Sequence, residues 1–81
     1  MKKNVNQLLK AKQINPQQAR VLMTLRKSSQ SLSNRKLAMA TNLPINVITP
    51  RCLQLRKMGL VMHDGRGYDH ETNRTVNLWT A

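Results

Sequence analysis

Residues 43–61, LPINVITPRCLQLRKMGLV, carry the most informative local pattern of the chain. Ile48, Cys52 and Leu55 stand at positions i, i+4 and i+7, which places them on one apolar stripe of a helix. This helix must end before Gly59, because glycine favours the conformation that terminates helices. The stretch therefore predicts an amphipathic helix that turns one face to a core.

The start of this helix has two alternatives. Pro44 marks one start, and Thr49 followed by Pro50 marks the other, because proline fits well only in the first turn of a helix. We expect a kink or a loose first turn between Pro44 and Thr49.

Two capping boxes further upstream predict helix starts. Asn15-Pro16-Gln17-Gln18 supplies a cap, a proline at the first helical position and a glutamine that reaches back, so a helix is expected from residue 16 to about residue 27. Asn4 and Gln7 form the same pattern, which predicts a short helix over about residues 4–12. A segment this short is marginal alone and must dock on the rest of the chain.

A further helix is expected after Ser33. Ser33 is a capping residue type, and Leu32 and Leu37 occupy the two positions of a hydrophobic staple. The helix should end near Asn42, which tolerates the left-handed conformation. With residues 43–61 this makes two helices joined by a short turn, the arrangement of a helix-turn-helix.

After Gly59 the pattern changes to that of strands. Residues 60–63 and residues 75–80 are rich in β-branched and apolar side chains, so both are predicted strands. Asp64-Gly65-Arg66-Gly67 has the residue types of a turn and opens a connection of about eleven residues.

The expected fold class is mainly α with a C-terminal β-hairpin, a winged helix-turn-helix. Its 81 residues suit a single domain, with residues 1–14 as an N-terminal helical extension, residues 15–58 as a three-helix core and residues 59–81 as the wing. Phe is absent and Trp79 is the one tryptophan, so we expect Trp79 to be the one large contributor to the core.

Charge is the strongest functional signal. The chain has 14 Lys and Arg against 3 acids, a formal net charge of +11, and all three acids (Asp64, Asp69 and Glu71) lie in the expected wing. Such a surface attracts polyanions, nucleic acid first among them, although a merely solvated basic surface is the alternative.

Other function classes find little support. Cys52 is the one cysteine, so no intramolecular disulfide can form. We expect no enzyme, because no nucleophile–base pair, phosphate loop or carboxylate dyad is visible, and no cofactor. We expect no metal site, because the spacing of the C-terminal histidines and acids resembles no known one; these are His63, Asp64, Asp69, His70 and Glu71. No apolar run suits a signal peptide or a membrane span, so the expected location is cytoplasmic and nucleoid-associated.

Residues 43–61 resemble the recognition helix of bacterial winged-helix regulators of the multiple-antibiotic-resistance type, and residues 73–80 are similar to the returning strand of their wing. The resemblance covers about residues 16–80 and implies the winged-helix fold and DNA binding. The chain departs from it by Pro50 inside the recognition helix and by the missing long dimerisation helices, so ligand sensing and dimer mode are not carried over. The short chain looks more like small winged-helix proteins of bacteriophages and mobile elements.

Four side chains of the recognition segment lie off the core stripe and are the expected base readers: Asn46, Thr49, Arg51 and Gln54. Arginine can contact guanine in a bidentate manner, and asparagine or glutamine can do so with adenine. Arg51 directly precedes Cys52 and is expected to point away from the core, toward the DNA groove. Thr49 is equally suited to capping.

The expected DNA-backbone contacts are Ser33, Arg35, Lys36, Arg56 and Lys57. Cations in the first turn of a helix oppose its dipole, which is easier to understand if Arg35 and Lys36 face a phosphate. In the wing, Arg66 and Arg74 could enter a minor groove, but the neighbouring acids repel DNA. The acidic wing could instead contact a protein or fold back onto the basic body.

The function expected from these features is that of a sequence-specific regulator of transcription that binds double-stranded DNA, of phage or prophage type. A nucleic-acid accessory protein (architectural, excision, replication or RNA-binding) and a protein–protein adaptor are the alternatives. A homodimer is left open.

Overall fold

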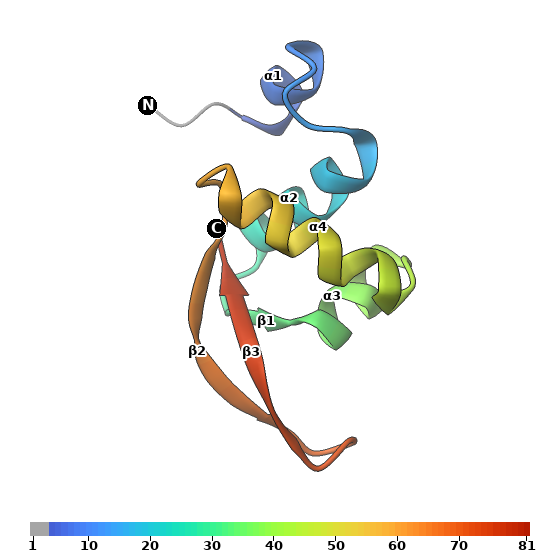
Figure 1. Ribbon diagram of the computed structural model, residues 1–81, viewed down its shortest axis with the longest axis vertical. Helices are drawn as coiled ribbons and strands as arrows, with labels where there is room; N and C mark the ends of the chain where they lie inside the picture. Colours follow the sequence, from blue (N-terminus) through green and yellow to red (C-terminus); the bar gives the residue numbers. More distant parts are fainter. Residues whose placement is uncertain (1–3) are drawn as a thin grey trace.

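The computed structural model describes residues 4–81, so residues 1–3 of the expected N-terminal extension lie outside the described part. The fold is mixed α/β, with helices packed around one core and a three-stranded antiparallel sheet toward the C-terminus (Figure 1). In chain order the elements are α1 (Val5–Lys10), α2 (Pro16–Lys27), β1 (Leu32–Ser33), α3 (Asn34–Thr41), α4 (Ile45–Lys57), β2 (Met62–Asp69) and β3 (Arg74–Thr80).

The helix starts follow the local capping signals. The side chain of Asn15 accepts a hydrogen bond from the Gln18 backbone N–H at 2.8 Å, and Gln18 Oε1 accepts one from the Asn15 N–H at 2.9 Å. The same reciprocal pair at the start of α1 confirms the second capping box. Ser33 caps α3, and Asn42 ends it with a φ of 59°, so both predicted ends of that helix are confirmed.

Helix α4 begins at the first of the two predicted starts. Ile45 follows Pro44, whose carbonyl accepts the N–H groups of both Val47 and Ile48, at 2.9 and 3.1 Å. The first turn thus combines i→i−3 and i→i−4 bonds, as is common at helix ends. Pro50 lies inside the helix, so a start at Thr49 is wrong.

The sheet contains a strand that the sequence did not predict. Its order is β1-β3-β2, with Leu32 opposite Trp79 and Ser33 opposite Leu78. The expectation of a hairpin alone is therefore incomplete. A strand of 2 residues is too short to show an alternating pattern, and it exists because β3 offers it a free edge.

Asp64–Gly67 is part of strand β2, so the predicted turn at these residues is wrong. The strand accommodates Gly65, with a φ of 70°, at an irregularity in register between His63 and Arg66. Glycine at positive φ is typical of a β-bulge as well as of a turn. The true connection is residues 70–73, which ends on Asn73 at a φ of 56°.

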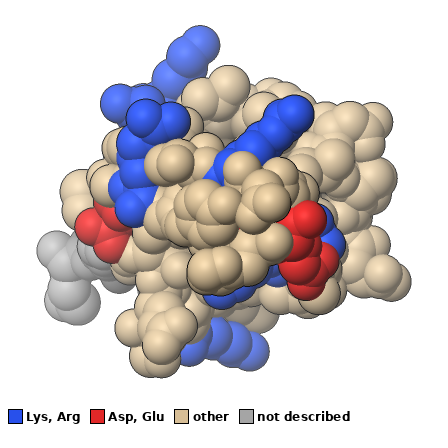
Figure 2. Space-filling model, turned by 90° about the horizontal axis from the view of Figure 1, so that it is seen from below, with Lys and Arg blue, Asp and Glu red and all other residues tan. Residues whose placement is uncertain are grey.

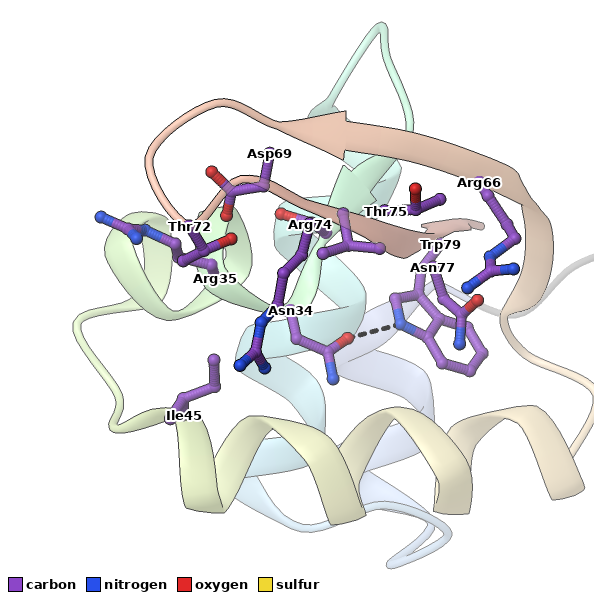
Figure 3. A pocket seen from close by; sticks show the side chains of 12 residues that line it. Asn34, Arg35, Ile45, Arg66, Asp69, Thr72, Arg74, Thr75, Asn77 and Trp79 are labelled. Atoms are coloured by element: carbon purple, nitrogen blue, oxygen red, sulfur yellow. Dashed lines mark hydrogen bonds between the residues drawn. The ribbon is translucent and has the colours of Figure 1, made fainter.

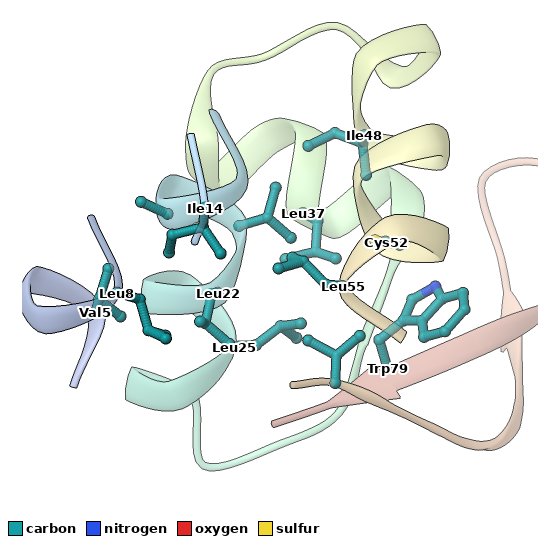
Figure 4. Close-up of a cluster of buried hydrophobic side chains, with 13 residues drawn as sticks. Val5, Leu8, Ile14, Leu22, Leu25, Leu37, Ile48, Cys52, Leu55 and Trp79 are labelled. Carbon is teal, nitrogen blue, oxygen red and sulfur yellow. The ribbon is translucent and has the colours of Figure 1, made fainter. Parts of the chain in front are cut away.

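One hydrophobic core joins α1 to the sheet (Figure 4). Leu22, Leu37 and Leu55 are fully buried at its centre. Trp79 is 4% exposed, which confirms its predicted place in the core. Among the described residues, no helix combines the length and apolar character needed to cross a membrane.

Candidate nucleic-acid interface

An open cleft of about 510 Å³ lies between the sheet and the N-terminal ends of α3 and α4 (Figure 3). Arg35 from α3, Arg66 from β2 and Arg74 from β3 line it together. Arg74 projects from the sheet toward Asn34 and the start of α4 (Figure 3). The fold thus gathers three predicted DNA-contacting arginines from three elements at one cleft.

Asn34, the first residue of α3, links this helix to β3 and to α4 beside the cleft. Its Oδ1 accepts a hydrogen bond from the Trp79 indole N–H at 2.6 Å, and its Nδ2 donates to Thr49 Oγ1 at 3.1 Å. The Thr49 hydroxyl donates in turn to the Ile45 carbonyl at 3.2 Å. Asn34 was not among the site residues expected from sequence; the only signal for it was that a buried indole N–H usually finds an acceptor.

Arg51 and Gln54 lie on the flank of α4 that faces α2. Arg51 Nε donates to Gln17 Oε1 at 3.1 Å, and its Nη1 donates to Gln54 Oε1 at 3.0 Å. The same Gln54 oxygen accepts a bond from Gln18 Nε2 at 2.9 Å. Arg51 is half-buried on this flank, and its expected role as a base reader stays a prediction. A base contact by Arg51 would require these bonds to break.

The outer face of α4 is made of other residues. Asn46 and Thr49 are exposed near its N-terminus, and Arg56 and Lys57 are exposed at its C-terminus. Between and beside them, Ile45 is 51% exposed and Leu53 is 47% exposed. The predicted readers Asn46 and Thr49 and the predicted backbone contacts Arg56 and Lys57 therefore share one solvent-facing side with apolar residues.

The residues expected at the start of α3 have different environments. Ser33 is 4% exposed, and its hydroxyl oxygen accepts the Lys36 N–H at 3.2 Å as the helix cap. Lys36 itself is exposed, and Arg35 is half-buried. The hydroxyl of Ser33 is thus committed to the cap, whereas both cations remain at the surface.

The acidic residues of the hairpin fold back onto the body or onto the hairpin itself. Glu71 forms an ion pair with Arg35, and Asp64 accepts a hydrogen bond from the Ser31 hydroxyl. Asp69 Oδ1 accepts the Glu71 backbone N–H at 2.9 Å, and this bond lowers the pKa of the Asp69 carboxyl. The acidic wing was expected either to contact another protein or to fold back onto the basic body. The ion pair between Glu71 and Arg35 is a contact of the second kind.

Seen from the hairpin end, basic side chains project on several sides of the molecule, with acidic side chains lying close to the surface between them (Figure 2). No three His, Cys, Asp or Glu residues of the described part come together as a metal site would require.

No protein-family model and no curated protein matches this sequence.

Proposed function

We propose that this chain is a winged helix-turn-helix protein that binds double-stranded DNA at specific sites and regulates transcription. The observation that carries the proposal is that Arg35, Arg66 and Arg74 line one cleft between the sheet and the N-terminal ends of α3 and α4. In such a complex α4 lies in the major groove and the β2–β3 hairpin lies along the flanking backbone.

The order of the elements supports this proposal. Helices α3 and α4 are joined by a turn of residues 42–44, as in a helix-turn-helix, and the hairpin follows directly. The hairpin extends beyond the helices, while α1 lies at the opposite end of the molecule (Figure 1). One side of the molecule therefore offers both a helix for a groove and an arm for the neighbouring phosphates.

The distribution of charge also supports DNA binding on the side of the molecule that carries the cleft. The chain has a net charge of +11, and the carboxylates near the cleft are engaged by Arg35 and by the Glu71 backbone N–H. Their repulsion of DNA is therefore reduced, while Arg66 and Arg74 remain exposed. Arginine at these positions suits phosphate or a narrow minor groove.

Binding to labelled duplex DNA over a range of salt concentrations tests the proposal. We expect log affinity to fall with log salt by about 0.9 for each phosphate neutralised. Arg74→Ala should weaken binding and make this slope shallower, whereas Lys10→Ala, which removes the same charge from α1 at the far end, should change it little. Affinity for duplex DNA that does not depend on salt would contradict the proposal.

Selection of bound sites from random duplexes then separates a regulator from an accessory protein. A regulator should yield one preferred sequence and a protected footprint on a genomic fragment. An accessory role is favoured by one observation: Arg51 and Gln54, two of the four polar readers expected on α4, are hydrogen-bonded to α2. Selection without enrichment would support that role.

A further inference from the structure

One flank of α4, beside the cleft, carries exposed apolar side chains. Ile45, Thr49 and Leu53 follow one another at intervals of four residues, so they form one line along the helix. Ile45 is 51% and Leu53 is 47% exposed, and neither belongs to the core or to the partly buried apolar residues packed against it. The core side of the helix is supplied separately by Ile48, Cys52 and Leu55.

Three polar side chains of α4 already form hydrogen bonds within the protein. The Thr49 hydroxyl donates to the Ile45 carbonyl and accepts from Asn34, so the methyl group is the part of Thr49 with no hydrogen-bonding role. Arg51 and Gln54 are hydrogen-bonded to each other and to α2. This flank of α4 therefore presents mainly methyl groups, and the exposed polar side chains of the helix beside it are Asn46, Arg56 and Lys57.

The major groove carries one apolar mark, the C5 methyl group of thymine. Residues four apart on a helix are separated by about 6 Å along its axis. Bases of one strand follow each other at about 3.4 Å, so neighbouring members of the apolar line match bases about two steps apart. Asparagine pairs well with adenine, which accompanies thymine in the same base pair.

We propose that Ile45, Thr49 and Leu53 read thymine methyl groups in the major groove, and that Arg51 and Gln54 are positioning residues that hold α4 on α2. This inference rests on the proposed DNA binding and adds the sequence class that is read. The charges favour DNA over a second copy of the chain on this face: Arg56 and Lys57 flank the line, and two copies would each bring a net charge of +11.

The test replaces thymine by uracil at single positions of the selected duplex, which removes the C5 methyl group and leaves base pairing intact. We expect the affinity of the natural chain to fall about four-fold for each methyl group that it buries. Leu53→Ala should weaken binding to the thymine duplex and abolish the thymine–uracil difference at its own position. Met62→Ala, which shortens an exposed apolar side chain at the base of the hairpin, should keep that difference.

The outcomes separate this inference from the proposed function. Equal affinity for thymine and uracil duplexes, with tight and salt-dependent binding retained, would overturn methyl readout and leave DNA binding intact. Absence of binding to any duplex would overturn both. Sedimentation that shows self-association of the natural chain, lost in Leu53→Ala, would overturn the inference in favour of an interface between copies. Circular dichroism of each variant confirms that it remains folded.

Discussion

The indole N–H of Trp79 donates a hydrogen bond to Asn34 Oδ1 at 2.6 Å, which joins the last strand of the sheet to the first residue of α3. Because the indole can only donate, the Asn34 oxygen must face it, and the Asn34 amide nitrogen is left to donate to Thr49 on α4. A single side chain thus fixes the hairpin relative to both helices of the proposed DNA-binding unit.

Asn34→Ala should therefore destabilise the protein beyond the usual effect of a surface substitution. It removes both hydrogen bonds and leaves the Trp79 N–H without its acceptor, at an expected cost of about 1–3 kcal/mol. Thermal unfolding measured by circular dichroism gives the change. Asn77→Ala, at an exposed position on β3, is the control and should stay within about 0.5 kcal/mol. Equal stability of the two variants would show that the Asn34 bonds contribute nothing net.

Trp79→Ala should cost about 3–5 kcal/mol of unfolding free energy, as is typical when a buried tryptophan is truncated. Trp79 is 4% exposed and lies in the core near the C-terminal end of β3 (Figure 4). In a domain of this size such a loss leaves little of the folded state. Urea unfolding followed by far-ultraviolet circular dichroism measures it, and an unchanged midpoint would contradict the packing of the indole described above.

Glu71→Gln should strengthen binding to duplex DNA. The substitution removes the carboxylate that pairs with Arg35 and so releases a cation at the cleft. Stability should change little, because exposed ion pairs contribute about 0.2–1 kcal/mol. Asp64→Asn makes the same change in net charge away from Arg35. An equal gain in affinity from both variants would show that only net charge matters.

Arg51→Ala and Arg56→Ala should behave differently. Arg51 bonds to Gln17 and Gln54, so its loss should lower the melting temperature and weaken specific binding indirectly. Arg56 is exposed, so its loss should leave the melting temperature unchanged and make the salt slope shallower by about 0.9. If Arg51→Ala instead keeps the melting temperature and loses discrimination among DNA sequences, Arg51 is a direct base reader.

The thiol of Cys52 should be unreactive in the folded protein. Burial raises the pKa of the Cys52 thiol to about 11 from an ordinary value of 9.0, so the thiol stays protonated at neutral pH. The folded state favours the neutral form, and its stability should therefore decline as the pH rises from 9 toward 11. Alkylation at pH 8 should be slow in buffer and fast in denaturant. Similar rates in both would contradict the burial of Cys52.

Several elements were predictable from sequence because their causes are local. The bonds that start α2 join Asn15 and Gln18, three positions apart, so the residue types alone predict them. The core stripe of α4 follows from the helical period. Trp79 could be assigned to the core because the chain offers no other residue of its size.

Residue types and their spacing were thus enough to predict where α1, α2 and α3 begin and which face of α4 meets the core, and they set the net charge of +11. Which flank of α4 packs on α2, and so which partners Arg51 contacts, depends on tertiary packing. The helical period identifies the buried face, but the two flanks beside it are equivalent until a neighbouring helix is placed. Tertiary packing also explains why β1 forms, why β2 continues through Gly65 instead of turning there, and why Glu71 pairs with Arg35. Each of these depends on a partner distant in sequence, whose position is set by packing rather than by local residue preference.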